Sequence, residues 1–75
     1  MDTPQTLDLR GIRCPLPIVR LNNQMKLTLP GQALEFIADD PAFLLDVQAW
    51  ARRLGYALTL TSPGGPDIRG TVCRP

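Results

Sequence analysis

This sequence of 75 residues contains no histidine, only two cysteines, and few aromatic side chains, which make up 5% of it. The lack of histidine excludes Cys–His and Ser–His hydrolases and most catalytic zinc sites. No apolar run approaches the ~20 residues of a membrane span, and the N-terminal residues do not form a signal peptide, so we expect a cytoplasmic protein. A net charge of +1 provides no strong field for nucleic acid. Any chemistry must therefore use a thiol, carboxylates, arginines or the backbone.

The length and the cysteine count predict a small protein without a disulfide framework. We expect one domain over residues 1–75, in which residues 1–5 form a loose leader. Cys14 and Cys73 are far apart in a chain without a secretory signal, which argues against a structural disulfide. We expect neither a metal ion nor a cofactor.

Hydrophobic periodicity predicts six elements. Apolar alternation or continuity indicates strands over residues 6–10, 33–38, 56–61 and 68–73. Apolar stripes of helical period indicate helices over residues 15–26 and 41–54, the second with the stripe Phe43, Val47, Trp50, Ala51 and Leu54. The order β-α-β-α-β-β predicts an α/β (α+β) two-layer sandwich, a four-stranded mixed sheet with both helices packed on one face. The β-α-β units imply parallel strands, and the loop at 62–67 implies an antiparallel return.

Cys14 stands where the first strand gives way to the first helix. We expect Cys14 to be the helix N-cap, with Pro15 and Pro17 in a first turn that tolerates proline. The N–H of Leu16 is then the natural donor to the sulfur. The positive end of the helix dipole and the neighbouring Arg13 favour the thiolate over the thiol. This is the environment of a reactive cysteine.

The thiol of Cys14 has no second cysteine at the position that would complete a Cys-x-x-Cys pair. Proline occupies position 17, so the thiol cannot resolve its own mixed disulfide. A lone thiolate can hold a group and pass it on, which favours a carrier over an oxidoreductase. The alternative is that Cys14 is a small buried hydrophobe. Cys73 is predicted to lie far from Cys14, as a bystander.

Charged residues flank this cysteine in the sequence and in the predicted fold. Arg10, Arg13 and Arg20 could be solvated surface charges, or together could stabilise the thiolate or dock an acidic partner. Asp39 follows the second strand, and parallel pairing places it on the Cys14 side of the sheet. Its neighbour Asp40 is predicted to cap the second helix, and Asp39 is the better candidate for a role in the site.

Three segments together resemble one known family. These are residues 7–17, ending in Cys-Pro-Leu-Pro, then Pro30-Gly31, and then Ile-Ala-Asp-Asp-Pro at 37–41, followed by Asp46 in the next helix. The chain is similar over residues 6–73 to the TusA-like (SirA-like) sulfur carriers with a Cys-Pro-x-Pro motif. The resemblance implies the same β-α-β-α-β-β fold and a persulfide on Cys14. It also implies a sulfur donor, a cysteine desulfurase or a rhodanese-type protein, and an acceptor in tRNA thiolation, molybdenum-cofactor sulfuration or sulfur metabolism.

Two other functions fit the residues. One is a non-catalytic module that binds protein or RNA through the open sheet face, although that face offers no aromatic platform for stacking bases. The other is a thiol redox sensor that uses Cys14 and Cys73 between two chains. We expect a monomer that meets a donor and an acceptor protein and does not bind nucleic acid directly.

Overall fold

The computed structural model describes residues 5–61 and 66–75. Its elements are β1 (Gln5–Leu9), α1 (Leu16–Lys26), β2 (Ala33–Ala38), α2 (Phe43–Leu54), β3 (Ala57–Leu60) and β4 (Ile68–Cys73). The predicted order of strands and helices is thus confirmed. None of the helices in the described ranges is long and apolar enough to cross a membrane.

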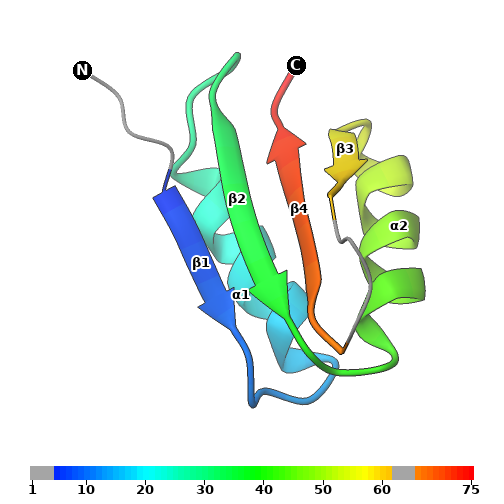
Figure 1. Cartoon of the computed structure of the whole chain (residues 1–75). Coiled ribbons are helices and arrows are strands. Elements are labelled where there is room, and N and C mark those ends of the chain that lie inside the picture. The colour runs from blue at the N-terminus through cyan, green and yellow to red at the C-terminus, as the bar shows by residue number, and fades with distance from the viewer. Residues whose placement is uncertain (1–4, 62–65) are drawn as a thin grey trace.

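The four strands form one mixed sheet in the order β1-β2-β4-β3 (Figure 1). β1 and β2 are parallel, and Leu9 at the end of β1 is in register with Ala38 at the end of β2. β4 lies between β2 and β3 and is antiparallel to both. The predicted antiparallel return and the interior position of β2 are confirmed. The insertion of β4 between β2 and β3 was not predicted.

Both helices lie on the same side of the sheet (Figure 1), as predicted. Between the two layers lies one hydrophobic cluster, to which every element except β3 contributes fully buried side chains. Its members are Leu9, Leu21, Met25, Leu34, Phe36, Ala38, Phe43, Val47, Trp50, Ala51 and Val72. The indole Nε1 of Trp50 in α2 donates to Oδ1 of Asn22 in α1 (3.1 Å), which links the two helices above this core.

The boundaries of β2 and β4 are those predicted, and the boundaries of the other elements differ by one or two residues. Gln5 belongs to β1 rather than to a leader, and the rest of that leader lies outside the described residues, as do residues 62–65 of the predicted loop. Leu54 was predicted to be in the core but is 45% exposed. It precedes the C-cap Gly55 (φ 75°), and the ring of Tyr56 beyond the cap packs edge-on against Trp50 instead.

Candidate functional site

The connections β1–α1 and β2–α2 leave the same edge of the sheet. Because β1 and β2 are parallel and in register at Leu9 and Ala38, residues 10–15 and 39–42 continue beyond the strands side by side. The prediction that Asp39 lies on the Cys14 side follows from this pairing and is confirmed by hydrogen bonds between the two connections. This edge of the sheet is the candidate site.

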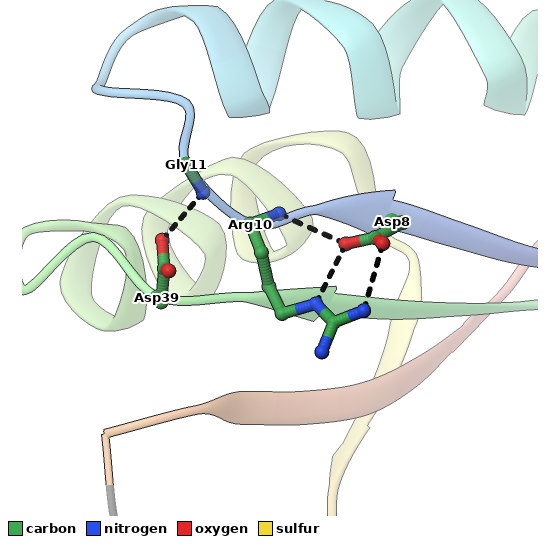
Figure 2. Close-up of polar contacts among 4 residues, drawn as sticks. All are labelled: Asp8, Arg10, Gly11 and Asp39. Atoms are coloured by element: carbon green, nitrogen blue, oxygen red, sulfur yellow. Dashed lines mark hydrogen bonds and ion pairs between the residues drawn. The ribbon is translucent and has the colours of Figure 1, made fainter.

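Asp39 holds the turn that leads from β1 toward Cys14. Its Oδ1 accepts the backbone N–H of Gly11 at 2.9 Å (Figure 2). Gly11 has φ 80°, a left-handed conformation that favours glycine because it has no Cβ. The hydrogen bond of Asp39 is thus made to Gly11, two residues before Arg13, and not to Cys14 itself. Asp39 therefore supports the site by holding the backbone of this turn.

Asp40 binds the backbone of Cys14 and is not the N-cap of α2. The cap residue is Ala42, and α2 begins at Phe43, so the predicted helix start at Pro41 is wrong. Oδ2 of Asp40 accepts the Cys14 N–H at 2.8 Å, and the carboxylate also accepts a hydrogen bond from the backbone of Ala42. With 8% exposure, Asp40 is the one buried charged residue in the described part of the chain. Its carboxylate joins the two connections.

Cys14 lies one residue before the helix cap, because Pro15 is the N-cap and α1 begins at Leu16. The predicted capping by Cys14 is wrong, since the N–H of Leu16 donates to the carbonyl oxygen of Arg13 (3.0 Å) and not to the sulfur. The Cys14–Pro15 peptide bond is cis. Cys14 is half-buried against the core, Pro15 is exposed, and Pro17 is buried in the first turn of α1.

The electrostatics of the thiol are the reverse of those predicted. Burial raises the pKa of Cys14 to about 12, and hydrogen bonds between the thiol and the carboxylates of Asp40 and Asp46 add to the rise. The thiol and the amide of Cys14 in turn hold the pKa of Asp40 below its ordinary value. The helix dipole and Arg13 favour a thiolate, but two carboxylates from a distant part of the sequence oppose it. The raised pKa favours the thiol form of Cys14 over the thiolate.

The three arginines near Cys14 in the sequence occupy different surroundings. Nη1 of Arg13 lies 3.7 Å from Oδ1 of Asp40, and the Arg13 side chain is 73% exposed. Arg10 forms a bidentate ion pair with Asp8, in which Nε donates to Oδ1 at 3.0 Å and Nη2 donates to Oδ2 at 2.9 Å (Figure 2). This contact lowers the pKa of Asp8 to about 2. Arg20 is exposed further along α1. Only Arg13 is thus paired with a carboxylate that touches Cys14.

Two residues of the site were not predicted as such from the sequence. Asp40 was interpreted as a helix cap, and Asp46 was not assigned a role in the site. The signal for Asp46 is its place in the first turn of α2, at the same edge of the sheet as Cys14. No group of three or more cysteine, aspartate or glutamate side chains within residues 5–61 and 66–75 is arranged to hold a metal ion. The chemistry of the site is that of one thiol between carboxylates.

Comparison with known proteins identifies sequence relatives over almost the whole chain. The family model described as sulfurtransferase TusA matches residues 5–74. A protein from Allochromatium vinosum named sulfur carrier protein TusA is 40% identical over 57 residues, which cover 76% of this chain and 75% of that protein. A relative from Aquifex aeolicus, whose name also describes a sulfur carrier, is 43% identical over 54 residues. That match covers 72% of this chain but 27% of the relative, so the chain spans about a quarter of its length.

A comparison of structures gives the same fold. The crystal structure of a SirA-like protein from Desulfitobacterium hafniense superposes with a TM-score of 0.77 and 23% sequence identity. The match covers 91% of this chain and 93% of the other. At this level of identity the similarity concerns the fold.

Proposed function

Because the chain belongs to the TusA family of sulfurtransferases, we propose that it is a sulfur carrier whose Cys14 accepts and hands over a persulfide sulfur. The donor is a cysteine desulfurase or a rhodanese-type protein that presents a persulfide, and the acceptor is a second protein in sulfur trafficking. The observation that carries the proposal is the half-buried Cys14 at the start of α1, beside exposed Pro15 and buried Pro17. A partly exposed cysteine at the start of a helix with proline in its first turn supports a role in carrying a group.

Loading is an exchange between two sulfur centres. The sulfur of Cys14 attacks the terminal sulfur of the donor persulfide, a new S–S bond forms at Cys14, and the S–S bond of the donor breaks. The proton of the Cys14 thiol passes to the leaving thiolate of the donor, so a thiol and a persulfide yield a persulfide and a thiol. In unloading, a nucleophile of the acceptor attacks the terminal sulfur, and Cys14 leaves as the thiolate and is reprotonated. No external oxidant or reductant is consumed.

The position of Cys73 supports a single-thiol carrier. Cys73 is in register with Ala33, the first residue of β2, whereas the Cys14 site lies beyond Ala38 at the other end of that strand. The five residue steps between Ala33 and Ala38 span about 16 Å. A disulfide needs Cα atoms within ~7 Å, so these two thiols of one chain cannot pair without a large rearrangement. In this proposal the sulfur on Cys14 is therefore transferred to another protein and not to Cys73 of the same chain.

The remaining predicted site residues act around the thiol in this proposal. Pro15 and Pro17 fix the direction in which the persulfide is presented, and Asp39 fixes the turn that precedes it. Arg13 and Arg20 are exposed cations that can meet an acidic partner surface. Arg10 is held by Asp8 in an ion pair and supports the turn between β1 and Cys14. We further propose that the carrier acts as a cytoplasmic monomer without direct contact to nucleic acid.

Intact-protein mass spectrometry tests the proposal. The protein is incubated with a cysteine desulfurase and cysteine, and separately with a rhodanese and thiosulfate. We expect one added sulfur atom in the wild type and in Cys73→Ser, removed by a reductant, and none in Cys14→Ser. An adduct that persists in Cys14→Ser, or the absence of an adduct with both donors, would contradict the proposal. A Cys73-dependent disulfide dimer under mild oxidation would favour the redox sensor instead.

A further inference from the structure

The Cys-Pro-Leu-Pro run has two backbone N–H groups, those of Cys14 and Leu16, because proline has none. The N–H of Leu16 donates to the carbonyl oxygen of Arg13 at 3.0 Å, within the same segment. The N–H of Cys14 donates to Oδ2 of Asp40 at 2.8 Å, across 26 positions of the sequence. The amide of Cys14 is therefore the backbone donor that ties this run to another part of the fold.

The carboxylate that accepts this hydrogen bond is itself held in place. Asp40 is buried and lies two residues beyond Ala38, the last residue of β2. Its carboxylate also accepts a hydrogen bond from the backbone of Ala42, and its Oδ1 lies 3.7 Å from Nη1 of Arg13. One side chain thus contacts both Arg13 and Cys14 and connects them to the end of β2.

We propose that Asp40 is a positioning residue of the carrier, whose hydrogen bond to the Cys14 N–H fixes the backbone from which the sulfur is received and handed over. This inference rests on the proposed function and adds a residue to it. Exchange of sulfur between two cysteines needs the reacting atoms ~3–3.5 Å apart and aligned, and a shift of about 1 Å can lower the rate about a hundredfold. A displaced Cys14 backbone should therefore slow transfer more than it weakens docking.

Two substitutions separate this hydrogen bond from the charge of Asp40. Asp40→Asn and Asp40→Ala both remove the negative charge, but only asparagine keeps a side-chain oxygen that can accept the N–H. Both variants and the parent carry Cys73→Ser, and their loading by a cysteine desulfurase with cysteine, or by a rhodanese with thiosulfate, is followed by intact-protein mass spectrometry. We expect kcat for Asp40→Ala to be at least about tenfold below that for Asp40→Asn, with KM changed by less than about threefold.

A second measurement needs no sulfur donor. Amide hydrogen exchange of Cys14, followed by NMR and compared with the amides of β2, reports local opening of this hydrogen bond. We expect exchange at Cys14 to be about tenfold faster in Asp40→Ala than in Asp40→Asn. If the parent accepted no sulfur from either donor, the proposed function would fail, and this measurement would still decide whether Asp40 fixes Cys14.

Val72→Ala is the matched control for lost stability. It opens space at a fully buried residue of β4, in register with Leu34 near the other end of β2 from the site. Its kcat and its relative exchange at Cys14 should equal those of the parent. Equal kcat values, or equal exchange at Cys14, in Asp40→Ala and Asp40→Asn would overturn the inference, as would an equally large loss of kcat in Val72→Ala. If Asp40→Ala did not fold, Asp40→Ser, whose hydroxyl is one bond shorter than the carboxylate, would replace it.

Discussion

Gly70 in β4 leaves the space that the ring of Phe36 occupies in the core. It is in register with Phe36 of β2 on one side and with Leu60 of β3 on the other. A Cβ at position 70 would lie 2.7 Å from Cζ of Phe36, 2.8 Å from the carbonyl oxygen of Thr59 and 3.2 Å from Cδ2 of Leu60. Two of these separations are shorter than real Cβ contacts, and one of them is to backbone. We therefore predict that Gly70→Ala strongly destabilises the fold.

The magnitude follows from the rigidity of the atoms that surround the added methyl group. Phe36 is 2% exposed and packs edge-on against Phe43 at 5.4 Å, so its ring cannot rotate away freely. Overpacking of a core costs typically 1–3 kcal/mol, and we expect about 3 kcal/mol here. A 75-residue protein has a free energy of unfolding of about 4–11 kcal/mol. The substitution should therefore lower the melting temperature by roughly 12–24 °C.

Urea unfolding measures this loss, with circular dichroism and the single tryptophan as probes. Gly31→Ala is the contrasting control, because a Cβ there meets nothing within 4 Å while φ is +86°. It should cost about 1 kcal/mol from backbone strain alone. Phe36→Leu in the Gly70→Ala background should recover part of the loss. A loss for Gly70→Ala below about 0.5 kcal/mol would refute the reasoning, since surface-like substitutions cost no more than that.

Two further predictions concern the thiol and the contact between the helices. Because folding raises the pKa of Cys14 from 9.0 to about 12, the native state keeps a proton that the unfolded state loses, and the free energy of unfolding should fall as pH rises through that interval. Cys14→Ser should flatten this decline in urea titrations, and an equally steep decline would contradict the shift. Trp50→Phe removes the hydrogen bond to Asn22 and part of a buried ring. We expect it to lower the free energy of unfolding by at least about 1 kcal/mol, measured by urea unfolding followed by circular dichroism. An unchanged unfolding midpoint would show that this contact does not stabilise the packing of the helices.

Much of the fold could be predicted because its signals are local. Leu21 and Met25 follow the helical period, and both are fully buried. The continuous apolar residues of β2 correctly indicated an interior strand, in which even Ile37, on the face opposite Phe36, is 5% exposed. The place of Cys14 between a strand and a helix also follows from neighbouring residues, and it was correct to within one position.

The electrostatic surroundings of the site could not be predicted in the same way. Arg13 is adjacent to Cys14 in the sequence, and a local interpretation therefore gave its positive charge too much weight. Arg10 was left open between a surface charge and a role near the thiol, and it binds Asp8, two positions earlier, from the turn that follows β1. Burial raises the pKa of Cys14 most, and the carboxylates that add to the rise come from Asp40 and Asp46, which the parallel pairing of β1 with β2 brings to this edge of the sheet.

The sequence by itself determined the six elements, the two-layer arrangement and the lone thiol at the start of α1, because each depends on periodicity or on neighbouring residues. Only the tertiary structure decided that β4 separates β2 from β3, that Gly70 makes room for Phe36, and that Asp40 binds the Cys14 backbone. These features depend on which distant segments pair and in what register. A pattern within one segment carries no information about its partner across the sheet, and both the burial of Cys14 and the carboxylates that raise its pKa depend on such partners.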